Sequence, residues 1–477
     1  MSAPSVPLAS KLLVCLLASV MAVVGVLTIA ATPASARGEQ PECDLIASPD
    51  GSDDGDGSAE DPLRSPQALV DGLDFGAPGN PAVGCFEPGD YDSDPVTSIE
   101  TTDVRLTSLG RPARLNGSVT VAAGADRVQL DRLILDGAAN PDAGTLTVLG
   151  DDFGLADSQV TERHVASEAN RATCVRIGTV QSRADRAEIT GNRVYDCGLR
   201  GTNADNGVAI YHSRGSLVSG NSISSSASRA VSLYPSAIHT RVLNNAIFDN
   251  GSAVLFDSAV DDDNGPASAL PPTGENIVAA NVIRHNGRNS DGQGTLLEEY
   301  QVYGRSDTAP GNVLAFNCLS GATGDGNLDP TGFLAGANVQ NQSRSQLCRT
   351  SYGPGGSSAA RPRCLDLTEG SDLANVITVA GSRNDFIAGN GGPDTLTSGP
   401  GADCLYGGED LDTLAGGEGS DLLHGGSGED TMRAGRGDDL IDARGDGAAD
   451  EIACGAGADI VYADASDEVA DDCERVR

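Results

Sequence analysis

The chain has 477 residues, and its 68 acidic residues against 31 basic ones give a formal charge of -37 at pH 7. So negative a protein repels nucleic acid and anionic lipid headgroups, which argues against both as partners and makes cations the natural ones. Aromatic residues make up only 4% of the chain, so a core has to be built from Val, Ile, Leu and Ala in small, regular layers. The composition therefore favours repeated short strands.

The first segment of the chain reads as an export signal. An uncharged run follows Lys11, and the small residues Ala34-Ser35-Ala36 form a cleavage signal before Arg37. We predict that residues 1–36 are a signal peptide and that the mature protein is secreted and extracellular, without membrane insertion. The alternative is an uncleaved anchor, because about 20 apolar residues can span a bilayer. Lys11 is the only lysine, so no lysine can act as a catalytic base.

The cysteine count agrees with export. Of eleven cysteines, Cys15 lies in the signal segment, which leaves ten, an even number that suits disulfides in an oxidising compartment. No C-x-x-C pair occurs, which argues against zinc or thioredoxin-like chemistry. Pairing of sequence neighbours suggests Cys43 with Cys85, Cys174 with Cys197, Cys318 with Cys348, Cys364 with Cys404, and Cys454 with Cys473.

The C-terminal part carries a repeat of nine residues. Aspartate recurs in register at Asp385, Asp394, Asp403, Asp412, Asp421, Asp430 and Asp439. An aliphatic residue or Met follows two positions after each, and glycines precede most of them, as in Gly416-Gly417-Glu418-Gly419-Ser420-Asp421. This segment resembles the RTX (hemolysin-type) calcium-binding repeat. The resemblance implies a parallel β-roll with a C-terminal cap, which we place at residues 364–477.

The residue types of this repeat suit calcium. Glycines permit turns with positive φ, and carboxylate and carbonyl oxygens are the ligands that Ca²⁺ prefers. If two repeats form one coil, as the resemblance implies, residues eighteen apart in the sequence lie side by side, and an ion between coils neutralises both carboxylates. The predicted ligands of several calcium ions are Asp394, Asp403, Asp412, Asp421, Asp430 and Asp439.

The ends of this array depart from the repeat. Arg383 replaces a turn glycine near the start, and an insertion after Ala443 interrupts the register before Asp450 and Asp459. This interruption makes calcium binding after the insertion doubtful, and Asp385 and Asp459 are expected to serve one ion at most. Terminal coils of a stacked array need a cap, and the stretch that contains Cys454 and Cys473 fits one.

The central part carries a weaker repeat in which an aliphatic residue, an asparagine three positions later and a second aliphatic residue recur. The clear copies centre on Asn192, Asn221, Asn245, Asn281 and Asn317, each followed by another alternating strand. Short strands at such intervals predict a parallel β-solenoid, in which the asparagines form a hydrogen-bonded ladder. The pattern is similar to the right-handed parallel β-helix of the pectate-lyase-like superfamily. The resemblance implies a helical cap near Ser65–Val70.

These two repeats define the expected architecture. The chain is predicted to be all-β, with a right-handed parallel β-helix at residues 37–349, a linker at residues 350–363 rich in Gly, Ser and Pro, and the RTX β-roll. Secreted β-helices of this kind often act on polysaccharides, but no known catalytic set is complete here. Asp151-Asp152 and Asn203-Ala204-Asp205 are similar to polygalacturonase carboxylates in reversed order and without the Gly-His-Gly element.

One column of the β-helix could contact a sugar. Alignment of the strands places Tyr211, Tyr234 and Asp257 on successive coils, and His212, Arg214, His239, Glu298 and Glu299 are expected nearby. Mannuronan C5-epimerases also join a β-helix to RTX repeats, but their Asp-Pro-His element is missing here. We therefore expect a secreted calcium-binding protein whose β-helix binds an extracellular polysaccharide. The alternatives are a polysaccharide lyase or C5-epimerase-like enzyme acting on a uronate polymer, and a surface adhesin; whether the chain is an enzyme stays open.

Overall fold

A computed structural model describes residues 41–74, 76–139, 144–162, 173–198, 206–257, 270–274, 276–284, 286, 302–304, 312–315, 317–320, 328–329, 334–336, 339–340, 366–371, 373–444 and 447–476. Two compact units are distinguished, Met1–Gln40 and Pro41–Arg477, and the first lies outside the described residues. Within the described part, no helix is long and apolar enough to cross a membrane. The predicted signal peptide, the linker and the domain boundaries remain predictions.

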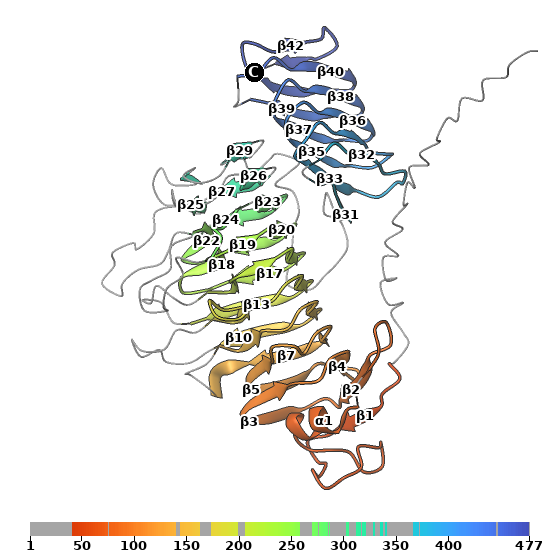
Figure 1. Ribbon diagram of the computed structural model, residues 1–477, viewed down its shortest axis with the longest axis vertical. Coiled ribbons are helices and arrows are strands. Elements are labelled where there is room, and N and C mark those ends of the chain that lie inside the picture. Colours follow the sequence, from red (N-terminus) through yellow and green to blue (C-terminus); the bar gives the residue numbers. More distant parts are fainter. Residues whose placement is uncertain are drawn as a thin grey trace, which may run out of the picture. The chain divides into compact units, whose positions relative to one another are not determined.

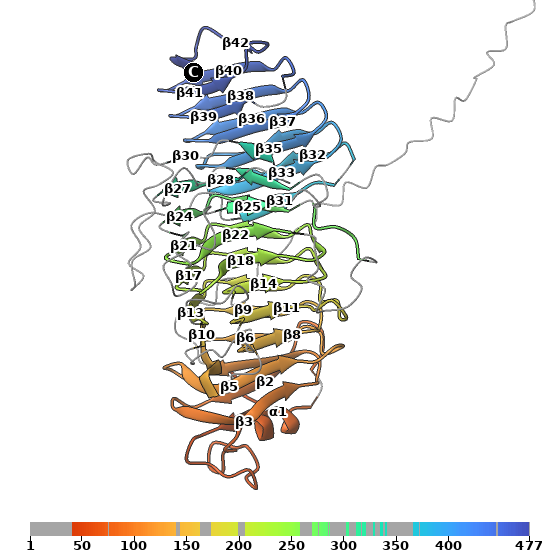
Figure 2. The same cartoon turned by 90° about the vertical axis from the view of Figure 1, so that its left-hand side faces the viewer.

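The β-helix is built from parallel strands that stack as successive rungs (Figures 1 and 2). Sheet A contains β1 (Leu45–Ala47), β2 (Ala82–Phe86), β4 (Val104–Ser108), β6 (Gln129–Asp131), β9 (Gly154–Ala156), β12 (Glu188–Thr190), β16 (Leu217–Ser219), β20 (Arg241–Leu243), β23 (Ile277–Ala279), β26 (Val313–Ala315) and β29 (Leu334–Gly336).

Sheet B follows two sides of the same coils. One side contains β3 (Asp90–Ile99), β5 (Ala113–Val121), β7 (Leu133–Asp136), β10 (Gln159–Glu162), β13 (Arg193–Cys197), β17 (Ser222–Ser224), β21 (Ala246–Phe248), β24 (Val282–Arg284), β27 (Cys318–Ser320) and β30 (Val339–Gln340). The other contains β8 (Leu146–Val148), β11 (Val175–Ile177), β14 (Val208–Ile210), β18 (Arg229–Leu233), β22 (Ser252–Phe256), β25 (Val302–Gly304) and β28 (Leu328–Asp329). A short parallel pair, β15 (Ser213–Arg214) and β19 (Ala237–Ile238), completes two coils.

Alternation along each strand produces the core of the β-helix. In β6, β9, β12, β16 and β20 of sheet A the middle residue points inward. These residues, Leu130, Leu155, Ile189, Val218 and Val242, follow one another in register and are buried. One aliphatic side chain per strand is enough because neighbouring coils stack 4.7–4.9 Å apart, roughly the width of such a side chain. The predicted small, regular layers are therefore present.

The predicted asparagine ladder is confirmed. The amide nitrogen of Asn221 donates to the Asn245 Oδ1 atom over 2.9 Å, and its Nδ2 donates to the same oxygen over 3.0 Å. The same bonds join Asn192 to Asn221, Asn245 to Asn281, and Asn281 to Asn317. Two further ladders accompany it, from Asn250 to Asn286 and from Asn276 to Asn312.

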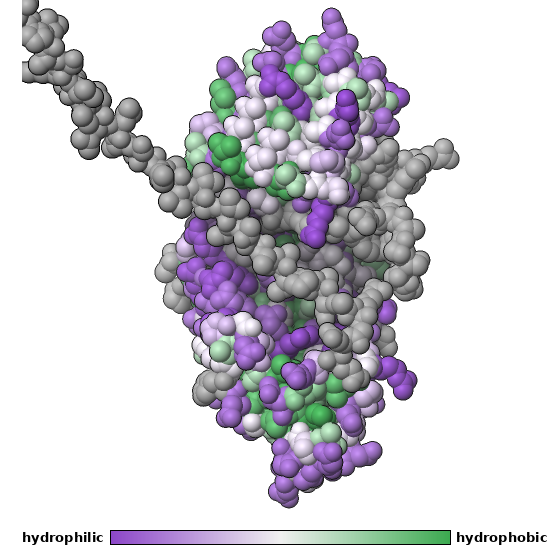
Figure 3. All heavy atoms as spheres, turned by 90° about the vertical axis from the view of Figure 1, so that its right-hand side faces the viewer, coloured by the Kyte–Doolittle hydropathy of each residue, from purple (hydrophilic) through white to green (hydrophobic). Residues whose placement is uncertain are grey.

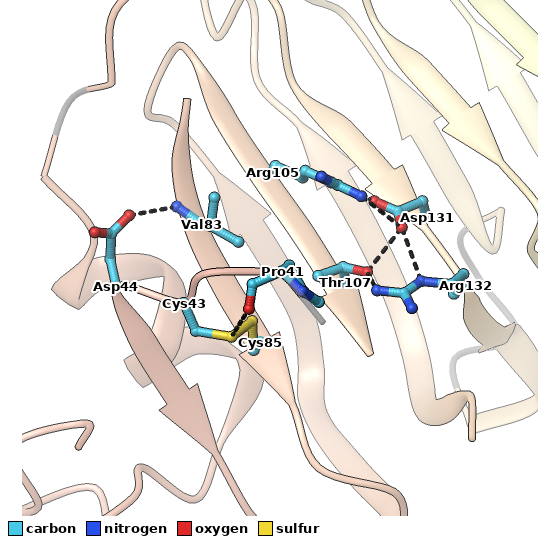
Figure 4. The surroundings of a disulfide bond; sticks show 9 residues. All are labelled: Pro41, Cys43, Asp44, Val83, Cys85, Arg105, Thr107, Asp131 and Arg132. Atoms are coloured by element: carbon cyan, nitrogen blue, oxygen red, sulfur yellow. Dashed lines mark hydrogen bonds and ion pairs between the residues drawn. A yellow bond between two sulfur atoms is a disulfide. The ribbon is translucent and has the colours of Figure 1, made fainter. Parts of the chain in front are cut away.

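A cap and a disulfide close the first coils. Helix α1 (Pro66–Gly72) begins after Ser65, whose hydroxyl accepts a hydrogen bond from the Ala68 amide, as expected for the helical cap; a short 3-10 turn, η1 (Gly137–Ala139), follows later. Figure 4 shows the disulfide between Cys43 and Cys85. On the neighbouring strands, Asp131 accepts hydrogen bonds from Arg105, Thr107 and Arg132.

Of the predicted disulfides, Cys43–Cys85, Cys174–Cys197 and Cys454–Cys473 are confirmed. The pairs Cys318–Cys348 and Cys364–Cys404 each have a member outside the described residues and remain predictions.

The β-roll consists of two parallel sheets. Sheet C contains β31 (Asp366–Glu369), β33 (Asp385–Asn390), β35 (Cys404–Glu409), β37 (Leu422–Ser427), β39 (Leu440–Ala443), β41 (Ile460–Ala463) and β43 (Arg475–Val476). Sheet D contains β32 (Val376–Thr378), β34 (Thr395–Thr397), β36 (Thr413–Glu418), β38 (Thr431–Arg436), β40 (Glu451–Ala456) and β42 (Glu468–Val469).

Two nonapeptides form one coil of the roll, as predicted. Leu405 pairs with Leu423 in sheet C, and Leu414 pairs with Met432 in sheet D, each eighteen residues apart. These side chains meet in a core cluster between the two sheets. The fold class predicted from the repeats, an all-β chain with a parallel β-helix followed by an RTX β-roll, is confirmed.

Candidate calcium sites and a candidate sugar-binding face

The repeat aspartates form two continuous columns along the roll. The Oδ1 atom of Asp412 accepts the amide hydrogen of Asp394 over 2.8 Å, and Oδ1 of Asp430 accepts that of Asp412 over 2.8 Å. In the second column, Asp403 donates to Asp421 over 2.9 Å and Asp421 donates to Asp439 over 2.8 Å. All six predicted ligands thus lie beside the partners expected from the spacing, and one oxygen of each bonds to backbone.

The other carboxylate oxygen, Oδ2, faces a space beside a glycine of the repeat, which we call the glycine cradle. The Oδ2 atoms of Asp394 and Asp412 are buried without a hydrogen-bond partner. A Cβ atom placed on Gly407 would lie 2.4 Å from the Asp412 Oδ2 atom and 2.4 Å from the carbonyl oxygen of Gly425. Only glycine leaves this space open. A carboxylate oxygen and a carbonyl oxygen of the next coil therefore face the same small gap.

This environment leaves the carboxylates in need of a positive charge. Burial, together with the nearby carboxylates of Asp430, Asp394 and Asp410, raises the pKa of Asp412 to about 8, although the Asp394 amide opposes the rise. Burial also raises the pKa of Asp403. Buried carboxylates that are neither paired with a cation nor fully hydrogen-bonded are costly. A bound divalent cation would remove this cost, and the oxygen-only donor set fits Ca²⁺.

The predicted tyrosine column is present on the β-helix, with one correction. The Tyr234 amide bonds to the Ile210 carbonyl and the Asp257 amide to the Leu233 carbonyl, so Tyr211, Tyr234 and Asp257 follow one another on successive coils. The two rings are half-buried and meet edge to face, with centroids 5.5 Å apart. Asp257 is only 3% exposed, and its backbone carbonyl accepts the hydroxyl hydrogen of Thr273 over 2.7 Å. The expectation that Asp257 faces a surface ligand is therefore wrong.

Histidine and arginine side chains lie beside this column. Burial, with the charge of Arg183, lowers the pKa of His212, so its imidazole is neutral at neutral pH. The Arg214 guanidinium lies 2.8 Å from Nε2 of His239, and since arginine only donates, this nitrogen is the acceptor of that hydrogen bond. The guanidinium of Arg176 lies 5.9 Å from the Tyr211 ring centroid. Glu298 and Glu299 lie outside the described residues.

The paired carboxylates noted in the sequence have a structural role. Asp151 Oδ1 accepts the Asp185 amide over 2.8 Å, and Asp152 forms an ion pair with Arg186 over 2.6 Å. Asp152 and Arg186 are also residues of positive φ at the same turn of successive coils. These contacts leave Asp151 and Asp152 as links between coils. The Asn203–Asp205 segment lies outside the described residues.

Comparisons with known proteins agree with this architecture. Residues 379–414 and 406–441 match the RTX calcium-binding nonapeptide repeat, so the chain carries RTX calcium-binding repeats. Residues 155–298 match the family described as periplasmic copper-binding protein (NosD). A sequence comparison with curated proteins finds no significant match.

Solved structures with a similar arrangement have low sequence identity. XylC in complex with xylose has a TM-score of 0.47 at 11% identity and covers 62% of this chain and 69% of its own. The Azotobacter vinelandii mannuronan C-5 epimerase AlgE6 A-module has a TM-score of 0.41 at 10% identity and covers 86% of this chain and 92% of its own. Pectate lyase Pel9A has a TM-score of 0.36 at 10% identity and covers 79% of this chain and 77% of its own. At this similarity they assign no activity to this chain.

Proposed function

We propose that this is an exported calcium-binding protein in which Asp394, Asp403, Asp412, Asp421, Asp430 and Asp439 bind Ca²⁺ ions between coils of the roll. The main supporting observation is that the two oxygens of the carboxylate have different surroundings. Oδ1 of Asp412 bonds to the backbone of the neighbouring coil, whereas its buried Oδ2 faces a glycine cradle. An ion in that place supplies the charge that burial otherwise denies the carboxylate.

Calcium titration of the full chain tests this proposal. Isothermal titration should show several binding events, and far-ultraviolet circular dichroism should show a gain of β-structure, because ion binding and roll folding are coupled. The double variant Asp412→Asn/Asp421→Asn should lose calcium equivalents. Its matched control, Glu409→Gln/Glu429→Gln, removes two exposed carboxylates of the same roll and should bind as the unaltered chain does. Absence of binding at millimolar calcium would refute the proposal.

Export is supported by covalent structure. Three disulfides are present among the described residues, and disulfides persist in oxidising compartments outside the cytoplasm. The disulfides support a location outside the cytoplasm, and we propose that this location is the extracellular space. Detection of the mature chain beginning at Arg37 in the culture medium, by N-terminal sequencing, tests both the cleavage and the location.

A second function concerns the β-helix face. Tyr211 and Tyr234 are half-buried and lie edge to face on successive coils beside Arg176. Aromatic rings with adjacent donors suit the apolar face and the hydroxyls of a sugar. We propose that this face binds an extracellular polysaccharide. A glycan array with the double variant Tyr211→Ala/Tyr234→Ala as the comparison tests it, and Tyr195→Ala is the control.

The enzymatic alternative is distinguished by products. A lyase or C5-epimerase acting on pectate or alginate would give unsaturated products or proton exchange at C5, which His212, neutral at pH 7, could assist as a base. Binding without either product supports the polysaccharide-binding or adhesin function. Turnover that is lost in His212→Ala but retained in His164→Ala would support the enzymatic function in place of binding alone.

A further inference from the structure

The outer face of sheet A changes character along the β-helix. In β12, β16, β20 and β23 the middle residue lies in the core, so its two neighbours point outward. On β12 these are Glu188, which is exposed, and Thr190, which is half-buried. The register continues through β16 to β20 and β23. The outward residues of these last two strands are all buried, namely Arg241, Leu243, Ile277 and Ala279. Other residues therefore cover this part of the sheet.

Residues of the roll supply this cover. One buried cluster joins apolar residues of sheet A with apolar residues of sheet C: Leu243, Ile277 and Ala279 with Phe386, Tyr406 and Leu422. Both groups belong to the compact unit Pro41–Arg477. The inside of the roll is filled by the alternate residues of the same strands, such as Leu405 and Leu423. The cluster therefore uses the outer face of sheet C.

The nonapeptide repeat carries an alternation that matches this contact. The residue that directly follows each repeat aspartate is apolar in sheet C, at Phe386, Cys404 and Leu422. In sheet D the same position is threonine, at Thr395, Thr413 and Thr431. A roll that met water on both outer faces would have no need of this difference, because contiguous apolar surface is normally kept from water. The period of eighteen therefore marks sheet C as the face that packs against other residues.

An ion pair fixes the same contact. The side chain of Arg241 on β20 is only 4% exposed and pairs with Glu369 of β31. Its guanidinium also donates to Oδ1 of Asn390 over 3.5 Å. A buried charge that loses its partner is strongly destabilising. Arg241 therefore favours the arrangement in which β31 lies beside it.

The covering residues are neighbours of proposed calcium ligands in the chain. Cys404 directly follows Asp403, and Leu422 directly follows Asp421. The Leu422 amide donates to the Asp403 carbonyl over 2.8 Å. Because ion binding and folding of the roll are coupled, calcium also arranges the outer face of sheet C. Ion binding and packing on sheet A thus involve the same strands, β35 and β37.

We propose that the outer face of sheet A at β20 and β23 is the docking surface for the roll of the same chain, and that docking couples calcium binding to the stability of the β-helix coils that it covers. This inference rests on the proposed calcium-binding function and adds an effect on the β-helix. The coupling is reciprocal, so calcium stabilises the covered coils and docking raises calcium affinity by the same factor. Loss of calcium would uncover an apolar surface on sheet A.

Calcium titration of full-chain variants tests the coupling, with Ca²⁺ itself as the probe. Leu243→Asp should weaken calcium affinity by about fivefold or more, although Leu243 is not a ligand. Thr190→Asp is the matched control, because Thr190 lies in the same outward column two strands earlier, and it should bind as the unaltered chain does. Unchanged affinity in Leu243→Asp would overturn the coupling. Absence of calcium binding by the unaltered chain would instead overturn the proposed function itself.

Hydrogen exchange of the full chain shows where calcium acts. In the unaltered chain, calcium should slow exchange in β20 and β23 and leave β4 and β6 unchanged. In Leu243→Asp, calcium should slow exchange in the roll alone, while unchanged protection of β4 and β6 shows that the β-helix is folded. Calcium-dependent protection of β20 and β23 that persists in Leu243→Asp would contradict the docking.

A charge swap examines the ion pair. Arg241→Glu places two carboxylates together and should weaken calcium affinity as Leu243→Asp does. Arg241→Glu/Glu369→Arg restores opposite charges and should recover most of the lost affinity. A double variant that binds calcium no better than Arg241→Glu would remove the ion pair from the coupling.

Discussion

At the scale of single residues, the roll depends on carboxylates whose two oxygens face different groups. Oδ1 of Asp412 receives a backbone amide, as Asn side chains do in the β-helix, whereas Oδ2 is turned toward a cradle lined by oxygen. Asparagine could serve the first role but not the second, because it lacks charge. The choice of aspartate over asparagine thus separates an ion-dependent stack from an ion-independent one.

This difference predicts opposite effects of two substitutions at one position. Asp412→Asn keeps the hydrogen bond to the Asp394 amide and removes a costly buried charge, so the calcium-free roll should become more stable while calcium affinity falls. Asp412→Ala loses the hydrogen bond as well and should be destabilised by about 1–3 kcal/mol. Thermal unfolding in chelator and in calcium measures both effects. Equal stability of the two variants in chelator would contradict the role given to Oδ1.

The glycine cradle gives a second prediction at this scale. Gly407→Ala would place a methyl group 2.4 Å from two oxygens, and the resulting shift should cost about 1–3 kcal/mol and weaken calcium binding. Gly381→Ala is the matched control, because the nearest atom to its Cβ would be the Arg383 nitrogen at 3.9 Å. Urea unfolding with and without calcium compares the pair; a harmless Gly407→Ala would show that the cradle can widen.

At the scale of elements, each half of the chain is a stack tied together by side-chain ladders. In the β-helix, Asn221 bonds to Asn192, Asn245 and the carbonyl of Ile189. These bonds lie inside a core of single aliphatic side chains, where an unsatisfied polar group is costly. The ladder therefore fixes the register of coils that the small side chains alone would specify weakly.

Asn221→Ala should for this reason destabilise the β-helix strongly. The substitution leaves buried partners on both neighbouring coils unsatisfied, at a cost of at least about 2 kcal/mol. Asn116→Ala, which removes one exposed hydrogen bond of 3.4 Å to Asp92, should change stability little. The shift of the urea midpoint at constant slope measures the difference, and similar midpoints for the two variants would contradict the ladder's energetic role.

At the scale of the whole molecule, the charges of the two halves respond to pH with opposite sign. In the β-helix, the Arg186 guanidinium lowers the pKa of Asp152. At Asp131 burial acts to raise the pKa, but hydrogen bonds from Arg105 and Thr107 outweigh it and lower it. In the roll, burial raises the pKa of Asp412 to about 8.

Hydrophilic side chains project from both ends of the described surface in Figure 3, in keeping with the high charge.

The calcium-free chain should therefore show two opposed pH profiles. A carboxylate with a lowered pKa contributes stability that is present above its unfolded value of about 3.9 and is lost in acid, so the β-helix weakens below pH 4. A raised pKa contributes stability that is present below about 3.9 and is lost as the pH rises through 8, so the roll weakens between about pH 4 and 8. Thermal scans in chelator measure both, and calcium should abolish the second profile. A calcium-free roll that becomes more stable with rising pH would contradict it.

Regular spacing made much of this fold predictable. The nine-residue repeat of aspartates predicted coils of eighteen residues, and Leu405 and Leu423 pair accordingly. The ladder at Asn221 and three disulfides were also predicted from the sequence. In each case a constant interval or a nearest neighbour in the chain corresponds to a contact in space.

Other features of the structure were missed. Asn250 and Asn286 follow the predicted ladder residues Asn245 and Asn281 by five positions, and this offset was the available signal. The alternation along its strand predicted Asp257 to point outward, whereas the structure buries it. The pairing of Asp459 with Asp439 escaped prediction because two inserted residues hide a register that only the backbone hydrogen bonds reveal.

The aspartate columns also give the roll a direction of growth. Each carboxylate accepts from the coil before it, so every coil is completed by its successor, and only the last one needs a special end. A duplicated segment of eighteen residues inserted between Asp403 and Asp421 would carry its own acceptors, its own cradle and the donors required by its neighbours. Such arrays can lengthen in evolution by internal copying while the disulfide-bonded terminus stays unchanged, and a protein engineer could extend this one by the same rule.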